Sequence, residues 1–183
     1  FRSLNGAVVK SDGTVFVSES DAGKISEIDP KDGSVKLLSG DVMYANGLVL
    51  SDDESALYAA STTGGKVYSI PLTGENRGKK KLFAGKLQVV DGLTKDGEGN
   101  LYACLFSAGK VAKLSPGGSS EIIAEGMATA ASPAYVNRTV TIPEADKSNP
   151  RHAYLYISNL GGKGIYKVTL NRGDAILRQE NKK

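Results

Sequence analysis

The sequence is poor in the residues on which disulfide-bonded and most metal-binding proteins depend. Its 183 residues include one cysteine, one histidine and no tryptophan. The single cysteine, Cys104, excludes an internal disulfide and a cysteine-rich zinc site, and the single histidine, His152, excludes a histidine-rich metal site. No apolar run approaches about 18 residues, so the sequence predicts no transmembrane helix.

An excess of charge of one sign is also lacking. The chain has 23 Lys and Arg residues against 20 Asp and Glu residues, which gives a net charge of +3. This balance is too even to indicate a nucleic acid or a membrane surface as a partner.

Glycine is abundant, with 22 residues, and much of it belongs to an internal repeat. Each copy opens with a polar residue and a glycine, continues through two apolar segments separated by a polar turn, and reaches a Gly-Lys pair. Three copies open at Asn5, Asn46 and Asp91, and a degenerate fourth copy opens near Ser132. The spacing of about 40 to 45 residues is typical of a β-propeller, in which each blade is a four-stranded sheet.

Every copy predicts four short strands, because its apolar segments alternate with a period of two and end at turn residues. In the first copy we expect strands near 6–10, 14–19, 24–28 and 34–38. The sequence therefore predicts a single all-β propeller domain over 1–183. The last residues of this domain, from 171 onward, are expected to form a polar tail. A β-sandwich is less suitable, since it has no reason to repeat its sequence in register. The four predicted blades cover 5–40, 46–85, 91–126 and 132–170.

The polar residues that open the repeats are the candidates for a functional site. The first strand of each blade lines the central channel, so a residue at its mouth lies near its counterparts from other blades. The glycine that follows allows close approach of the backbones. We therefore expect Asn5, Asn46 and Asp91 to converge, with Ser132 in the same phase. Their oxygen atoms are hard ligands, which suit calcium or magnesium.

The motifs around the third repeat resemble those of the senescence-marker-protein, gluconolactonase and luciferin-regenerating family. Val90-Asp91-Gly92-Leu93, the turn that ends in Leu101-Tyr102-Ala103, and Gly109-Lys110-Val111 carry the resemblance. Phosphotriesterases of the diisopropyl-fluorophosphatase type share this arrangement. Members have six blades, so the resemblance implies two further blades before Phe1, supplied by a preceding segment or by a partner chain. A closed ring of four blades is the alternative.

The resemblance also implies an activity. In the family a calcium ion lies in the channel, and Asn5, Asn46 and Asp91 match three of its ligands. The fourth ligand is a glutamate of the first blade, which no position of this chain matches. The implied function is calcium-dependent hydrolysis of lactones or related esters, with a small molecule as substrate and Asp91 as general base or nucleophile. Other divalent cations suit the same donors.

A second class of function stays open, which is a non-catalytic or strictosidine-synthase-like propeller that acts as a binding module. Propellers of the strictosidine-synthase and NHL types resemble this one and lack the calcium ligands. The set of Asn5, Asn46 and Asp91 favours the hydrolase. Substrate selectivity would come from the loops at the channel mouth. The candidates are Asp21, Ala22, Thr62, Thr63, Phe106 and Ser107.

The remaining polar and apolar residues are expected to have structural roles. We expect His152 and Glu19 on the surface, and Cys104 as a small buried residue. The sequon at Asn137 leaves a secreted location open beside a cytoplasmic one.

If blades are absent, the end blades expose apolar faces and the chain associates with itself. We expect these faces to carry Val8, Phe16 and Ile25 in the first blade and Tyr154, Tyr156 and Ile165 in the last.

Overall fold

The structure, a computed structural model, describes residues 1–138, 152–162, 164–170 and 175–180. It contains four antiparallel sheets of four strands, and the strands of each sheet follow the order of the chain. The sheets are β1 Leu4–Val9, β2 Val15–Glu19, β3 Lys24–Ile28 and β4 Val35–Ser39; β5 Ala45–Leu50, β6 Ala56–Ser61, β7 Lys66–Pro71 and β8 Lys81–Ala84; β9 Val90–Lys95, β10 Leu101–Leu105, β11 Lys110–Leu114 and β12 Ser120–Ala124; and β13 Ala130–Arg138, β14 His152–Asn159, β15 Ile165–Leu170 and β16 Ala175–Glu180. The predicted all-β fold is confirmed.

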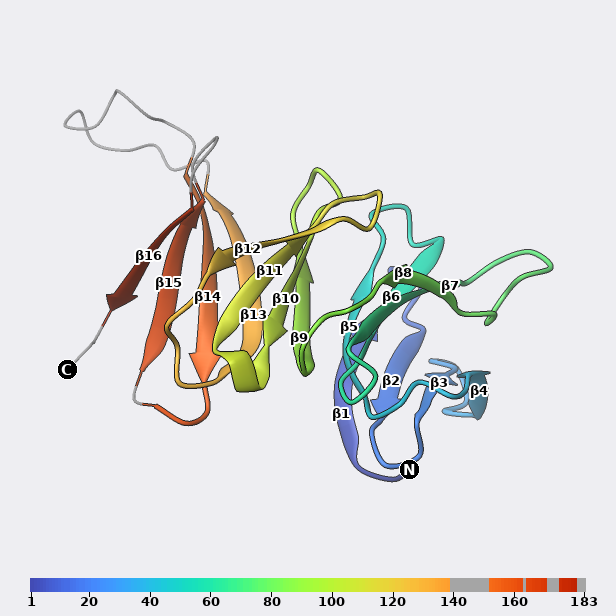
Figure 1. Cartoon of the computed structure of the whole chain (residues 1–183). Coiled ribbons are helices and arrows are strands. Elements are labelled where there is room, and N and C mark those ends of the chain that lie inside the picture. The colour runs from blue at the N-terminus through green and yellow to red at the C-terminus, as the bar shows by residue number, and fades with distance from the viewer. Residues whose placement is uncertain (139–151, 163, 171–174, 181–183) are drawn as a thin grey trace.

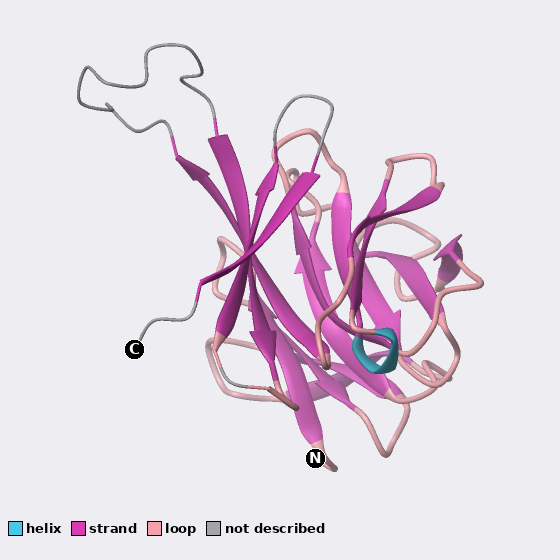
Figure 2. Cartoon of the chain, turned by 60° about the vertical axis from the view of Figure 1, so that its left-hand side comes forward, coloured by secondary structure: helices cyan, strands magenta, loops and turns pink. Residues whose placement is uncertain are grey.

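The four sheets follow one another in space as they do in the chain, as the blades of a β-propeller do. In Figure 1 the first sheet and the last sheet lie at opposite ends of this row, and Figure 2 shows the same sheets from another side. The one helical element of the described residues is a single turn, η1, Phe106–Ala108. No helix among these residues has the length and apolar character needed to cross a membrane.

Turns with local hydrogen bonds join strands within the first three sheets. Between β1 and β2, Asp12 Oδ1 accepts a hydrogen bond from the backbone N–H of Thr14 at 2.9 Å. Gly13 follows Asp12 with φ of +88°, a left-handed conformation that favours glycine. The Asp-Gly pair thus determines where the first hairpin turns.

The first strand of each sheet packs against the first strand of the next, and glycine permits the close approach. A Cβ atom on Gly47 of β5 would lie 2.6 Å from the backbone nitrogen of Leu93 in β9. A Cβ atom on Gly6 would lie 2.6 Å from the Asn46 oxygen, and one on Gly92 would lie 2.7 Å from Pro133 Cδ. These distances confirm that the glycines of the repeat allow the inner strands β1, β5, β9 and β13 to crowd together.

The hydrophobic core lies between neighbouring sheets rather than at one centre. Three clusters of buried side chains fill the three spaces between the four sheets. The largest fully buried apolar members are Phe16, Ile25, Leu57, Ile70, Leu101, Leu114, Leu155 and Ile157. Each sheet is therefore stabilised mainly by the sheets beside it.

The prediction for the exposed face of the first sheet was wrong. Val8, Phe16 and Ile25 belong to the cluster between the first and second sheets, and Phe16 and Ile25 are almost fully buried. Alternation along a strand separates two faces, but it does not tell which face a neighbouring sheet covers. The exposed apolar side chains of the first sheet lie on its other face and are Leu4, Val9, Val35 and Leu37. In the last sheet Ile165 is exposed as expected, and Tyr154 and Tyr156 are half-buried.

The segment interpreted as a polar tail contains the last strand of the fourth sheet. β16 pairs with β15 from Ile165↔Glu180 to Leu170↔Ala175, so this sheet extends ten residues beyond the predicted blade end at 170. Polar residues are common in the outermost strand of a sheet, where they discourage pairing with other chains. Composition alone therefore did not distinguish an edge strand from a tail.

Candidate metal and catalytic site

Each inner strand contains a bulge at the polar residue that opens its repeat. In the first sheet Leu4 pairs with Glu19 and Ala7 pairs with Val17, so Asn5 and Gly6 together lie opposite one residue. Register shifts of the same form enclose Asn46-Gly47 in β5 and Asp91-Gly92 in β9. The three polar residues therefore occupy equivalent positions at one end of neighbouring strands. A bulge also changes the direction in which their side chains point.

The fourth sheet does not continue this pattern as the sequence suggested. Ala130 pairs with Asn159 and Pro133 with Ile157, so the bulge of β13 contains Ala131 and Ser132. Ala131 is the equivalent of Asp91, and Ser132 takes the place of the glycine. The expectation that Ser132 occupies the same repeat position as Asn5, Asn46 and Asp91 was therefore wrong. The fourth repeat is too degenerate for its residues to be aligned without the observed pairing of β13 with β14.

Asp91 is the one carboxylate among the three polar residues at the bulges. Its side chain is half-buried, and burial raises the pKa of the carboxyl because it disfavours the charged form. A hydrogen bond from the Asn46 side chain partly offsets this rise in the pKa. Asn46 itself is 5% exposed. Asn46 and Asp91, from neighbouring sheets, thus contact each other through their side chains.

Asn5 is held by a different contact. Its Nδ2 donates to Ser20 Oγ at 3.2 Å, and the side chain is otherwise exposed. Ser20 Oγ in turn donates to the backbone oxygen of Ala45 at 2.8 Å. The amide nitrogen of Asn5 is therefore engaged, and its Oδ1 is the atom available to a ligand.

A second serine joins the same two inner strands through their backbones. Ser18 Oγ accepts from Gly6 N–H at 2.7 Å and donates to the Asn46 backbone oxygen at 2.7 Å. Ser18 is fully buried and Ser20 is nearly so. Sequence reasoning missed both serines, although they lie on either side of Glu19, with Ser18 in β2 and Ser20 directly after it.

The donor atoms fit calcium or magnesium in kind. One carboxylate and two amide oxygens are hard ligands, and calcium accepts such groups together with water. Among the described residues no group of three or more His, Cys, Asp or Glu side chains could hold a metal ion. A cation at the bulges would thus interact with a single protein carboxylate, which favours weak binding.

The loops expected to determine selectivity begin at the same end of the sheets as the bulges. In each of the first three sheets, the last residue of the second strand pairs with the residue just before the bulge. These last residues are Glu19 of β2, Ser61 of β6 and Leu105 of β10. The residues that follow these strands therefore surround the bulge residues. One of them, Thr62, is buried, and its Oγ1 has no hydrogen-bond partner.

Two other expectations differ in outcome. Cys104 is fully buried, as predicted, and burial together with the nearby Asp91 charge raises the pKa of its thiol, so it is unsuited to act as a nucleophile. Glu19 was expected on the surface but is almost fully buried, where it accepts hydrogen bonds from Arg2 N–H and Ser26 Oγ. The side chain of His152 and the last residue of the sequon at Asn137 lie outside the residues that the structure describes.

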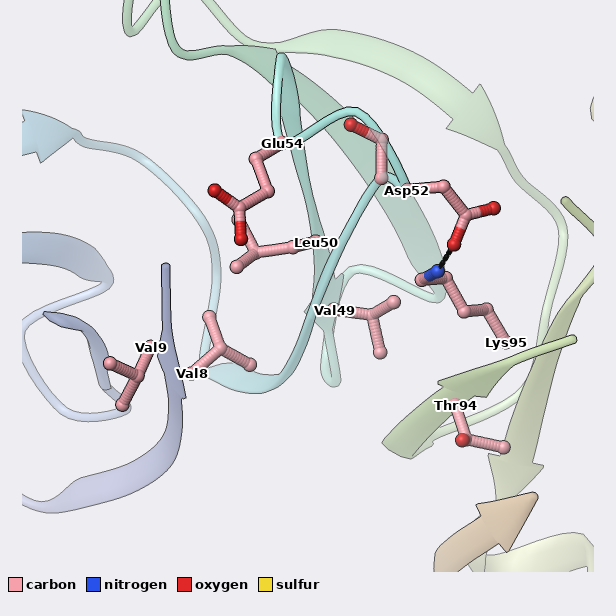
Figure 3. A pocket seen from close by; sticks show the side chains of 9 residues that line it. Val8, Val9, Val49, Leu50, Asp52, Glu54, Thr94 and Lys95 are labelled. Atoms are coloured by element: carbon pink, nitrogen blue, oxygen red, sulfur yellow. Dashed lines mark hydrogen bonds and ion pairs between the residues drawn. The ribbon is translucent and has the colours of Figure 1, made fainter. Parts of the chain in front are cut away.

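A cavity of about 450 Å³ lies at the other end of the inner strands. Val8, Val49 and Leu50 form its apolar side, and an ion pair between Lys95 and Asp52 lies at its rim (Figure 3). None of its lining residues is a candidate from the repeats. The ion pair joins the second and third sheets, which gives it a structural role.

Comparison with known proteins agrees with the family that the repeat motifs indicate. Residues 2–141 match the SMP-30/Gluconolactonase/LRE-like region. The chain belongs to this family. The family assignment made from the sequence motifs is thereby confirmed.

One curated relative is a 6-deoxy-6-sulfogluconolactonase from Pseudomonas putida, which is 34% identical over 88 residues. The match covers 45% of this chain and 30% of the relative, so it spans under a third of that protein's length.

Solved structures resemble nearly the whole chain. A gluconolactonase from Xanthomonas campestris aligns with a TM-score of 0.67 and 18% identity, over 96% of this chain and 57% of that one. Virginiamycin B lyase from Staphylococcus aureus aligns with a TM-score of 0.69 and 15% identity, over 97% of this chain and 56% of that one. At such identities the likeness shows the shared fold alone.

Proposed function

We propose that the chain is part of a calcium-dependent hydrolase that opens lactones or related esters. The observation that carries the proposal is the equivalent position of Asn5, Asn46 and Asp91 at the bulges of three neighbouring inner strands. Family membership and the similarity to a sulfogluconolactonase support a lactone as the substrate.

Asn5 Oδ1, Asn46 Oδ1 and the Asp91 carboxylate would hold the cation. A calcium ion bound there would polarise the carbonyl group of the lactone. The number of protein ligands is small, so water and the substrate would complete the coordination.

Asp91 would also act as the general base. It takes a proton from a water molecule whose oxygen bonds to the carbonyl carbon, and the ring C–O bond then breaks. The proton passes to the oxygen of the opened ring, so the product is a hydroxy acid. General-base catalysis of this kind contributes about 100-fold to 10,000-fold to a rate.

The test is a calcium isotherm by calorimetry beside a lactone hydrolysis assay with gluconolactone, both on the 183-residue chain. We expect weak calcium binding and hydrolysis that chelation of calcium abolishes. Absence of calcium binding and of hydrolysis would instead support the alternative, a non-catalytic propeller that acts as a binding module.

A further inference from the structure

Thr62 has a hydroxyl group that the fold buries without a partner. The residue is 8% exposed, and its Oγ1 is the one buried side-chain oxygen or nitrogen without a hydrogen bond in the part of the chain that the structure describes. An unpaired buried hydroxyl costs free energy, so its presence in a well-packed fold calls for an explanation.

The register of the sheets gives Thr62 the same place as Ser20. Ser20 follows Glu19, which pairs with Leu4, the residue before Asn5. Thr62 follows Ser61, which pairs with Ala45, the residue before Asn46. Each hydroxyl residue therefore lies at the same offset from the asparagine of its own sheet.

Ser20 shows what a hydroxyl at this offset does. It accepts the Asn5 side-chain N–H and donates to the backbone oxygen of Ala45 in the next sheet. This contact fixes the Asn5 amide nitrogen and leaves Asn5 Oδ1 to a ligand.

Asn46 does not use its equivalent hydroxyl, because Thr62 Oγ1 has no hydrogen-bond partner. The Asn46 side chain instead bonds to the Asp91 carboxylate. A cation on that carboxylate competes for the same lone pairs and repels the amide N–H group, which carries partial positive charge. The N–H group released in this way needs another acceptor, because Asn46 is buried.

We propose that Thr62 is the positioning residue for Asn46 in the cation-bound site. Its hydroxyl accepts the Asn46 side-chain N–H, as Ser20 accepts that of Asn5, and Asn46 Oδ1 becomes a ligand of the cation. The inference rests on the proposed function, because it requires that Asn5, Asn46 and Asp91 hold a divalent cation.

The test is Thr62→Val in the 183-residue chain, with calcium affinity measured by calorimetry and thermal stability measured without calcium. We expect the affinity to fall about tenfold, the effect of one lost hydrogen bond in the bound state. The melting temperature without calcium should stay the same or rise, because valine has a similar shape and lacks the unpaired hydroxyl. Thr62→Ser should restore most of the affinity.

Ser61→Ala is the matched control. Ser61 is fully buried, and its hydroxyl donates to the backbone oxygen of Met43 at 2.9 Å, outside the contacts of Asn46 and Asp91. This variant should lower the melting temperature and leave the calcium affinity unchanged. The opposite responses of Thr62→Val and Ser61→Ala would separate positioning of a ligand from support of the fold.

The side-chain amide signals of Asn46 in a nitrogen–proton NMR spectrum provide a second readout. In the wild-type chain these signals should shift as calcium is added, and in Thr62→Val the shift should be smaller. Unchanged calcium affinity in Thr62→Val would overturn the role of Thr62 alone. A wild-type chain that binds no calcium would overturn the proposed metal site and this inference with it.

Discussion

At the scale of the residue, Asp91 combines two roles in the proposed chemistry, as the one charged ligand and as the base. Asp91→Asn keeps the size and one oxygen donor but loses the negative charge and the ability to take a proton. We predict weaker calcium binding and hydrolysis slower by at least about 100-fold. Calorimetry and the lactone assay measure the two effects separately, and circular dichroism should show an unchanged fold.

Asn46→Asp is the companion variant, because it adds a charge where Asp91→Asn removes one. Calcium should bind at least as tightly, while turnover falls because a more negative site polarises the carbonyl group less. Full activity in Asp91→Asn would remove Asp91 from the mechanism and leave the two asparagines as the basis of the metal site.

The glycines of the inner strands allow a prediction about stability. In Gly47→Ala the new Cβ would lie 2.6 Å from the Leu93 nitrogen and 2.8 Å from the Asp91 oxygen, so two inner strands must move apart. We expect a loss of about 2 kcal/mol in the free energy of unfolding, typical of overpacking. Gly97→Ala, where no atom lies within 4 Å of the added Cβ, should change the stability little. Equal urea midpoints for the two variants would contradict the proposed reason for the repeat glycines.

Glu19 illustrates what strand alternation leaves out at this scale. The pattern placed it on a face of β2, but it did not reveal that the backbone of Arg2 would cover that face and bond to the carboxylate. Burial acts to raise the pKa of Glu19, yet the hydrogen bonds from Ser26 and Arg2 and the charge of Lys24 hold it below its usual value. Burial of a charge by a segment distant in the sequence depends on tertiary contacts that no local pattern contains.

At the scale of the element, the turn between β9 and β10 is organised by the buried Asp96. Its carboxylate accepts hydrogen bonds from the backbone N–H groups of Glu98 and Asn100, from Asn100 Nδ2 and from the Tyr102 hydroxyl. The Tyr102 ring stacks on Tyr135 of the fourth sheet, with centroids 6.0 Å apart. The turn thereby connects the geometry of one hairpin to the packing of two sheets.

The same carboxylate makes stability depend on pH. Burial acts to raise the pKa of Asp96, but its hydrogen bonds outweigh burial and lower the pKa in the folded chain. The stabilisation is therefore complete above the unfolded pKa of about 3.9 and is lost as the pH falls through the lower folded value. Asp96→Asn should cost about 2 kcal/mol at neutral pH, because two donors would then face an amide N–H group.

Urea denaturation at several pH values tests this prediction. The wild-type chain should lose stability as the pH falls below about 4, and the difference between wild type and Asp96→Asn should shrink over that range. A difference that is independent of pH would show that the carboxylate does not contribute through its charge.

The strands and turns were the part of the fold most open to prediction, because each depends on local residues. In the first sheet the four predicted strands agree with the observed ones to within two residues at every end. The bulges were not predicted as such, since a bulge is defined by the pairing of two strands. That is why Ser132 was aligned with Asp91, although the register assigns this position to Ala131.

At the scale of the whole molecule, the fold alone does not determine the reaction. The same arrangement of sheets is found in a gluconolactonase and in a lyase, both under 20% identical to this chain. Any reaction therefore depends on the residues of a site rather than on the fold, and this chain spans only 56% and 57% of those two proteins.

The exposed apolar face of the first sheet leads to a prediction about how the 183-residue chain behaves in solution. Leu4, Val9, Val35 and Leu37 form an apolar face on the first sheet, each about half exposed or more, and water-exposed apolar faces of this kind promote association. We predict that the chain associates with itself, and that the double variant Val9→Lys, Leu37→Lys raises the dissociation constant at least about tenfold, because two charges cannot be buried in the contact.

Leu160→Lys is the control, since Leu160 is 78% exposed and lies in the loop after β14, away from this face. Sedimentation velocity over a range of concentrations measures all three proteins. A wild-type chain that remains a monomer at every concentration would show that the exposed face of the first sheet does not drive association.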